Sequence, residues 1–210
     1  MSIAKNNQTL EEVFNIFAKN FNKIKENQSY EFEVRFGTKK IKTISQIDFY
    51  NVISSIINNG FELDSEYYNL KIILDNTNNS LRTNISGLNN IQKYCKSDNI
   101  DDIDDKFIEF IEKSYHMESG KKCLFDFDDY NFRISQQIET LYNKSDGKVN
   151  DILTQWSSTK KIFRYMKRFV FKNNKIPFLI HMSIVKMSNS SDKVNSYINI
   201  RDSDVFNSNE

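Results

Sequence analysis

The chain is poor in the residues that break or cross-link structure. Its 210 residues include one proline, five glycines and two cysteines. So little proline and glycine argues against a linker-rich or fibrous protein. Two cysteines without paired spacing fit neither a zinc site nor a disulfide framework, so we expect Cys95 and Cys123 to be buried structural thiols. The length fits one globular domain with a sizeable core, spanning residues 1–210.

Histidines and long apolar runs are also scarce. With only His116 and His181 in the sequence, an imidazole-rich metal site is excluded and any metal must be held by carboxylates. Carboxylate ligands point to a hard cation such as magnesium or manganese. No apolar run approaches the roughly 20 residues of a membrane span, and the N-terminus is polar where a secretion signal would be apolar. We therefore expect a soluble, intracellular protein of the cytoplasm that makes no membrane contact.

Charge is balanced overall but segregated along the chain. The formal net charge of +1 argues against a protein that coats nucleic acid non-specifically. Residues 98–112 concentrate carboxylates: Asp98, Asp101, Asp102, Asp104, Asp105, Glu109 and Glu112. Residues 160–175 concentrate cations: Lys160, Lys161, Arg164, Lys167, Arg168, Lys172 and Lys175. The basic segment is a candidate polyphosphate or RNA surface.

Helical periodicity predicts four helices. A capping box of Thr9 and Glu12 starts the first, over about 10–25, and a box of Ser45 and Asp48 starts the second, which ends at Gly60. The acidic segment 98–112 carries one apolar stripe and is predicted to form a third helix, with carboxylates in its first turn. A short fourth helix covers about 149–156.

Between these helices the residues alternate between apolar and polar, which predicts strands at about 30–36, 67–75, 80–86, 122–142, 160–172 and 177–187. In the first strand Glu31, Glu33 and Arg35 share one face, opposite an apolar face. The polar faces of the later strands contain Arg82, Arg133, Glu139, Arg164, Arg168, His181 and Ser183.

A one-sided sheet with its polar face in water would show the same alternation. Arginine is favoured on these faces, however, and its planar guanidinium suits bidentate phosphate contacts. We therefore predict an α+β fold, mainly an antiparallel β-barrel with a charged lumen and helices packed outside.

The segment Tyr30–Gly37 has the pattern E-x-E-x-R-F-G at the start of the predicted barrel. This pattern resembles the triphosphate tunnel metalloenzymes, and most of all the RNA triphosphatase module of mRNA capping enzymes from large DNA viruses and amoebae. Further segments agree in order: Ser80–Gly87, Asn131–Glu139, Phe163–Arg168 and Phe178–Lys186. The resemblance covers about 30–187. It implies hydrolysis of the γ-phosphate of 5′-triphosphate RNA (pppRNA) to 5′-diphosphate RNA (ppRNA), the first step of capping.

The resemblance also implies the partners and the location of the domain. It would be a monomeric N-terminal module, with guanylyltransferase and cap methyltransferase modules following in the natural polypeptide. In a virus it would act in the viral factory or the virion.

The resemblance assigns roles to residues of the polar faces. Glu31 and Glu33 would hold Mg²⁺ or Mn²⁺, and Glu139 would orient a neighbouring cation or a metal-bound water. Ser183 takes the hydroxyl position of a late D-x-(T/S) strand, and His181 stands where the family has aspartate, so its phosphate-binding role is open. The phosphate clamps would be Arg35, Arg82, Arg133, Arg164 and Arg168, of which Arg35 is also a catalytic candidate.

Two features leave alternatives open. The family completes its metal site with a second E-x-E strand, whereas Ile198–Asp204 lacks glutamates, so that strand is expected beyond residue 210. Without it, the domain would bind RNA 5′ ends or polyphosphate without hydrolysing them. The same fold could also act on nucleoside triphosphate, tripolyphosphate or thiamine triphosphate.

Lys144–Gly147 matches the K-x-D-G signature of nucleotidyltransferases, but four-residue matches are common and a turn is the favoured interpretation.

Overall fold

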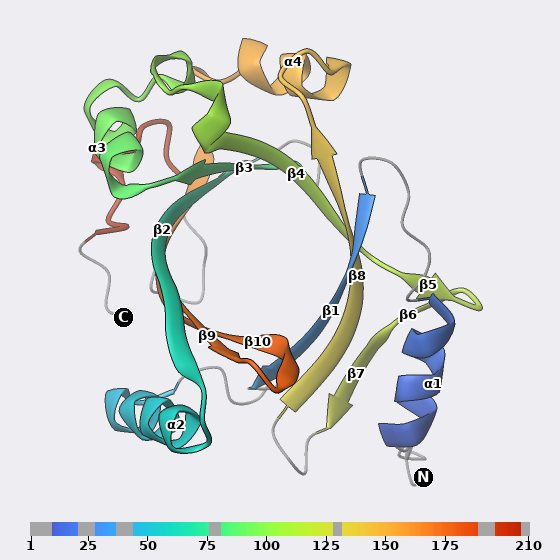
Figure 1. The fold of residues 1–210 in the computed structure, drawn as a ribbon. Coiled ribbons are helices and arrows are strands. Elements are labelled where there is room, and N and C mark those ends of the chain that lie inside the picture. Colours follow the sequence, from blue (N-terminus) through green and yellow to red (C-terminus); the bar gives the residue numbers. More distant parts are fainter. Residues whose placement is uncertain are drawn as a thin grey trace, which may run out of the picture. The chain divides into compact units, whose positions relative to one another are not determined.

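The computed structural model describes residues 10–20, 28–36, 44–75, 81–127, 132–188 and 196–206, and structural statements below concern these residues. The chain divides into two compact units. The first comprises residues 1–43 and 113–140, and the second comprises 44–112 and 141–210. Figure 1 labels the helices and strands of both units. No described helix combines the length and apolar character that a membrane span needs.

The first unit is built on the antiparallel pair of strands β1 and β8. Glu31 lies opposite Gln137 and Glu33 opposite Ser135, while β7 pairs with the first half of β8. Its elements are α1 (Leu10–Asn20), β1 (Gln28–Phe36), β5 (Met117–Glu118), β6 (Lys121–Lys122), β7 (Leu124–Phe127), the end of β4 (Ile108–Tyr115) and most of β8 (Phe132–Tyr142).

The core of the first unit lies on one face of β8. Val13 of α1, Cys123 and Ile134 are buried there, and the half-buried rings of Phe125 and Phe132 pack against them. Successive side chains in a strand point to opposite faces. Because Ile134 is buried on one face of β8, Arg133, Ser135 and Gln137 lie on the other face.

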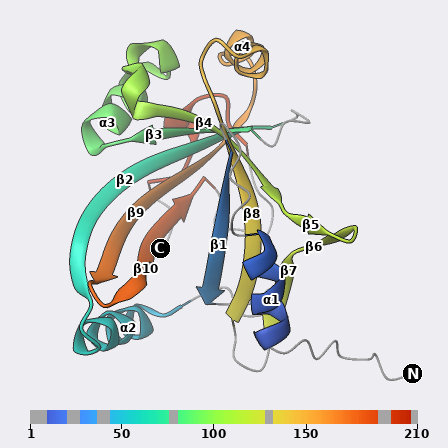
Figure 2. The same cartoon turned by 45° about the vertical axis from the view of Figure 1, so that its right-hand side comes forward.

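The second unit contains a five-stranded antiparallel arrangement in the order β4, β3, β2, β9, β10 (Figure 2). Its longer strands are β2 (Glu62–Leu74), β9 (Lys161–Asn173) and β10 (Ile176–Met187), and β3 is Leu81–Ser86. Its helices are α2 (Gln46–Asn58), α3 (Leu88–Ser97) and α4 (Gly147–Thr154), with 3-10 turns at Ile100–Asp102, Asp105–Phe107 and Ile200–Asp202.

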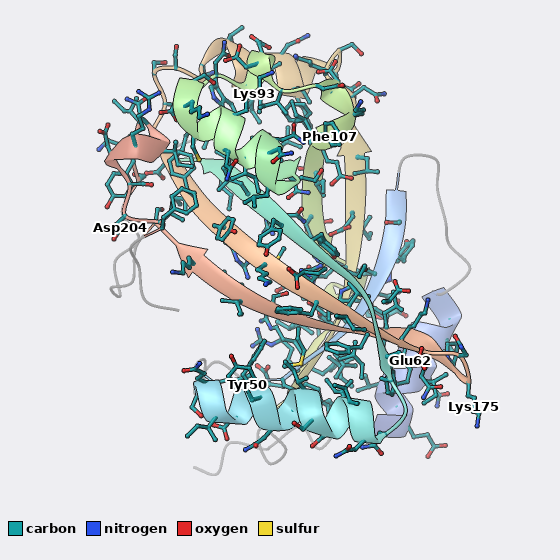
Figure 3. All side chains as sticks on the ribbon, turned by 60° about the vertical axis from the view of Figure 1, so that its left-hand side comes forward. Tyr50, Glu62, Lys93, Phe107, Lys175 and Asp204 are labelled. Atoms are coloured by element: carbon teal, nitrogen blue, oxygen red, sulfur yellow. The ribbon has the colours of Figure 1, made fainter. Side chains whose placement is uncertain are left out.

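The main core of the second unit joins its sheet to α3 and α4. Leu70, Ile72 and Phe163 of the sheet are fully buried against Tyr94 of α3 and Ile152 of α4. A smaller cluster under α2 contains Ile56, Phe61 and Phe171. Figure 3 shows α2, which carries Tyr50, near one end of the sheet of the second unit. At that end β2 begins at Glu62 and β9 turns into β10 at Lys175. Helix α3, which carries Lys93, lies at the other end of this sheet.

Most predicted elements are confirmed. The six predicted strand regions are all present, with residues 122–142 divided into β7 and β8. The second helix starts as expected, because the Ser45 hydroxyl accepts a hydrogen bond from the backbone N–H of Asp48 at 3.1 Å. It ends before Gly60, which has a φ of 80° that favours glycine. The first helix is present over Leu10–Asn20, while its predicted cap Thr9 and its predicted last residues, 21–25, lie outside the described residues.

The predicted α+β class and the mainly antiparallel sheet are confirmed. The closure of that sheet into a barrel is not. The hydrogen-bonded strand order is β1, β8, β4, β3, β2, β9, β10, with β7 also pairing with β8. No ladder among the described residues joins β1 to β10, so the sheet is not closed.

The prediction of a helix over 98–112 was wrong. Two 3-10 turns are followed there by strand β4. The side chains of Asn99 and Asp104 accept hydrogen bonds from backbone N–H groups two residues ahead, which favours turns over a helix. Ile108 and Phe110 then alternate as buried residues of a strand. Helix α3 was missed because Asn89, Asn90 and Ser97 give it weak helical propensity.

Candidate functional site

The first unit carries a polar strand face centred on a carboxylate–lysine cluster. We call it the first polar face: Glu31, Glu33, Arg35, Lys113, Arg133, Ser135, Gln137 and Glu139. The ammonium of Lys113, on β4, donates to Glu31 and lies 3.2 Å from an oxygen of Glu139. The Lys113 side chain is only 18 % exposed. The structure therefore brings two predicted site carboxylates together around a cation that the sequence did not single out.

The environment of Lys113 favours its charged form. Burial disfavours the ammonium, but the hydrogen bond and charge of Glu31, together with Glu139, outweigh burial and raise the pKa of Lys113 above its usual 10.5. Lys113 therefore stays protonated at neutral pH.

Substitution of Lys113 by methionine is expected to destabilise the fold at neutral pH. Loss of the ammonium leaves Glu31 and Glu139 unpaired, and because Glu31 is 40 % exposed we expect a loss of about 1–2 kcal/mol rather than the larger cost of a fully buried pair. A folded-state pKa above the unfolded value means that this stabilisation is present below about pH 10 and is lost as pH rises further. Urea unfolding of wild type and Lys113→Met across pH 7–11.5 measures the difference, which should shrink only above pH 10. A difference that grows there would contradict the ion pair.

Glu33 is positioned by a buried amide. The side-chain nitrogen of Gln137 is 3.3 Å from a Glu33 oxygen and 3.0 Å from the Ser135 hydroxyl. Ser135 and Gln137 are buried polar residues. Glu31 and Glu33 therefore project from alternate positions of one strand, each held by a different partner.

The two arginines of the first polar face differ in their surroundings. Arg133 makes a two-pronged ion pair with Asp126 of β7, with N–O distances of 2.6 and 2.9 Å. This hydrogen bonding raises the pKa of Arg133 above its already high usual value. Arg35 lies opposite Arg133 in the ladder and is exposed. Arg133 is thus anchored, whereas Arg35 faces solvent.

Asp126→Asn is expected to lower the free energy of unfolding by about 1–3 kcal/mol. The substitution removes the anionic partner of Arg133, whose side chain is 9 % exposed. The cost is lower than in a fully buried pair, because the Asp126 side chain is 33 % exposed. Asp104→Asn is the matched control, since Asp104 is 57 % exposed and asparagine can still accept the backbone N–H of Lys106. Chemical denaturation should show a loss for Asp126→Asn alone. Equal stabilities of the two variants would contradict a structural ion pair.

The second unit carries a polar face on the side of its sheet opposite α3 and α4. We call it the second polar face: Tyr67, Lys71, Arg82, Asn84, Glu109, Arg164, Arg168, His181 and Ser183. One row across the strands is Arg164, Lys71, Asn84 and Glu109. The Asn84 amide donates to Glu109 at 2.9 Å. Cations from β2, β3 and β9 therefore share this face.

Arg168 of the second polar face is held by side chains of three strands. Its guanidinium donates to the hydroxyls of Ser183 at 3.1 Å and Tyr67 at 3.2 Å, and contacts the sulfur of Met166 at 3.3 Å. Ser183 lies directly opposite Arg168 in the ladder, and His181 lies two residues earlier on the same face of β10. The predicted Arg168 and Ser183 are thus in contact.

Several functional candidates were not predicted from the sequence. Lys71, Tyr67 and Asn84 lie on the second polar face, and Glu109 was assigned to a helix. The signal for Lys71 was present, because it alternates with Leu70 and Ile72. The signal for Lys113 was hidden by the same incorrect helix. The basic segment 160–175 does not form one surface. Arg164 and Arg168 belong to the second polar face, and Lys161 and Lys167 point away from it. Lys175 lies on the exposed turn between β9 and β10, outside that face.

The carboxylates suit a hard divalent cation. Within the described residues, no three His, Cys, Asp or Glu side chains gather as a metal site. Magnesium is commonly held by one or two carboxylates, with substrate phosphates and water completing its shell. Glu31 and Glu33 on one strand face fit that donor set.

The other sequence candidates have structural explanations. Lys144 of the K-x-D-G match forms ion pairs with Asp101 at 3.0 Å and Asp105 at 3.3 Å, in a turn that leads into α4. This placement agrees with the turn interpretation. Cys95 and Cys123 are free thiols; Cys123 is buried as predicted and Cys95 is half-buried.

The fold has a counterpart among solved structures. The chain is similar to the triphosphatase of the mimivirus capping enzyme, with a TM-score of 0.54, 21 % sequence identity, and coverage of 85 % of this chain and 80 % of that chain. No family model matches the sequence, and the search of curated proteins finds no match. At this identity the likeness shows the fold, and the predicted resemblance is confirmed at that level.

Proposed function

We propose that the chain is a metal-dependent RNA 5′-triphosphatase, which hydrolyses pppRNA to ppRNA and phosphate as the first step of mRNA capping. The observation that carries the proposal is the pair of glutamates on one face of β1, positioned by Lys113 and Gln137. It is supported by the arginine-rich second polar face and by a fold similar to a viral capping enzyme triphosphatase.

The carboxylates and the arginines would have different roles in the reaction. Glu31 and Glu33 would hold Mg²⁺ or Mn²⁺, which when bound would neutralise phosphate charge and orient phosphate oxygens. Arg82, Arg164 and Arg168 would neutralise the non-bridging oxygens, where charge is spread during phosphoryl transfer. The Ser183 hydroxyl orients Arg168, and His181 on the same strand face is a further phosphate-binding candidate.

The remaining residues of the first polar face would position the reactants. Glu139 holds Lys113, and is placed to orient that cation or a water. Arg35, which is exposed, would contact phosphate directly, and Arg133 would do so from its fixed position beside Asp126. In the reaction, a water oxygen bonds to the γ-phosphorus and the bond to the bridging oxygen breaks. The products are orthophosphate and ppRNA.

The cellular setting is part of the proposal. The substrate is 5′-triphosphate RNA, and the product is the acceptor of a guanylyltransferase. We propose that guanylyltransferase and cap methyltransferase modules share its polypeptide, and that the domain acts as a monomer inside the cell without membrane contact.

Side-by-side kinetics on γ-labelled pppRNA, ATP and tripolyphosphate test the proposal. We expect the highest kcat/KM for pppRNA and a product RNA that retains two phosphates. A preference for ATP or tripolyphosphate would assign the same site to a nucleotide or polyphosphate phosphatase.

A non-catalytic role is the second candidate. It is motivated by Ile198–Asp204, which lacks the glutamates of a second E-x-E strand. Tight binding of pppRNA without turnover, measured on the natural polypeptide, would support that role and contradict hydrolysis.

A further inference from the structure

The helix-bearing face of the second unit has a hollow that the proposed chemistry does not use. Two depressions, of about 650 and 240 Å³, adjoin there because both are lined by Tyr165 and Phe206. The larger is also lined by Leu88, Ile91, Gln92, Cys95 and Lys96 of α3. The smaller is also lined by Lys167, Ile184 and Lys186 of the sheet. We call both together the outer hollow.

An aromatic platform forms the centre of the outer hollow. The rings of Tyr165 and Phe206 meet edge to face, with centroids 5.4 Å apart and planes at 63°. Tyr68 stacks on Tyr165 with centroids 6.2 Å apart, and both tyrosines pack against the main core. Phe206 remains 44 % exposed. Figure 1 shows the C-terminal segment that carries it beside α3. The platform therefore combines rigid support with an accessible ring.

Lysines surround this platform. Three line the outer hollow and, among the described residues, no carboxylate does. Lys186 lies directly opposite Tyr165 in the ladder, and Lys167 lies opposite Ile184. Glu66, outside the lining, pairs with Lys167 at 3.0 Å. Lys96 approaches from α3 and is exposed. The lining therefore receives positive charge from Lys96 on α3 and from Lys167 and Lys186 on the sheet.

We propose that the outer hollow binds a single-stranded segment of RNA, with bases stacked on Phe206 and Tyr165 and phosphates paired with Lys96 and Lys186. Single strands present a flat apolar base and a negative charge at every nucleotide, and proteins bind them with aromatic rings interspersed with cations. The proposal rests on the proposed function in taking RNA as ligand, and it assigns the RNA body a surface separate from the two polar faces. An acidic peptide matches the charge but not the repeated flat units.

The test uses the whole chain and a fluorescent single-stranded RNA with a 5′-hydroxyl end, which carries no triphosphate. Phe206→Ala should weaken binding about 5- to 150-fold, the range for loss of one base–aromatic stack. The pair Lys96→Gln/Lys186→Gln should lower the slope of log Kd against log salt by about 0.7 per lysine. Lys175→Gln is the control, because Lys175 is exposed on the turn between β9 and β10, at the other end of the unit from α3 (Figure 3).

A chemical footprint locates the bound RNA. Cys95 lines the outer hollow and is half-buried, whereas Cys123 is 1 % exposed and lies in the first unit. The same 5′-hydroxyl RNA should slow the reaction of Cys95 with a small thiol reagent. The reaction of Cys123 serves as an internal reference and should not change.

Several outcomes would overturn the proposal. They are no binding of 5′-hydroxyl RNA by wild type, equal binding by Phe206→Ala, or no protection of Cys95. Protection of Cys95 by a peptide of Glu and Phe, without protection by RNA, would assign the outer hollow to a protein partner. These results are independent of hydrolysis. If the protein releases phosphate but its RNA binding does not depend on Phe206, only the proposal for the outer hollow is refuted. If RNA binding depends on Phe206 but no phosphate is released, only the triphosphatase proposal is refuted.

Discussion

Replacement of Glu31 and Glu33 together by glutamine should reduce phosphate release from pppRNA by at least about 1000-fold. Glutamine keeps the size of each side chain but removes the negative charge that a divalent cation requires. Loss of one group that stabilises transition-state charge typically costs about 100- to 1000-fold in kcat. Single-turnover release of γ-labelled phosphate is the measurement, with circular dichroism to confirm that the double variant folds.

The effect should depend on position rather than on charge alone. Glu118→Gln is a matched control, because Glu118 belongs to the first unit but lies in the short β5 strand, beside His116. It should retain wild-type turnover. Binding of Mn²⁺, followed by electron paramagnetic resonance, should be lost in the double variant and kept in Glu118→Gln. Full activity of Glu31→Gln/Glu33→Gln would remove the basis for the proposed metal site.

Arg168→Ala should slow phosphate release about 30- to 1000-fold, equivalent to about 2–4 kcal/mol of barrier. The guanidinium is held by Ser183 and Tyr67, so its charge needs no rearrangement during the reaction. Arg168→Lys should recover only part of the rate, because a lysine ammonium is a point charge and cannot reproduce the fork of donors.

Lys175→Ala is the control for Arg168, since it removes a cation from an exposed turn of the same unit. It should leave kcat and KM unchanged. Initial rates across pppRNA concentrations separate the two parameters, and a role in transition-state stabilisation predicts a fall in kcat. A rise in KM alone would limit Arg168 to ground-state binding of RNA.

Strand faces were predictable from the sequence because alternation in a strand is local. Glu31 and Glu33 share a face in any regular strand, and the structure keeps them there. Partners distant in sequence were not predictable. Lys113 is 82 residues from Glu31, and a helix over 98–112 hid the strand that leads to it. The turn-forming side chains of Asn99 and Asp104 were the overlooked signal.

The arginines show the same limit. Their residue type and alternation predicted two-pronged contacts with phosphate, but gave no partner within the protein. For Arg133 the structure supplies Asp126 from the neighbouring strand β7. The interpretation of Arg168 gained most from the structure, because its contacts with Ser183 and Tyr67 depend on the pairing of three strands.

Metal-dependent phosphate release from pppRNA tests the proposed activity most directly. The protein, purified as its natural polypeptide, is mixed with γ-labelled RNA in a chelator, and Mg²⁺ or Mn²⁺ is then added in excess. We predict no release before the addition, and afterwards release of one phosphate per RNA that leaves a 5′-diphosphate end. Release in the chelator, or none after metal addition, would contradict a triphosphatase built on Glu31 and Glu33.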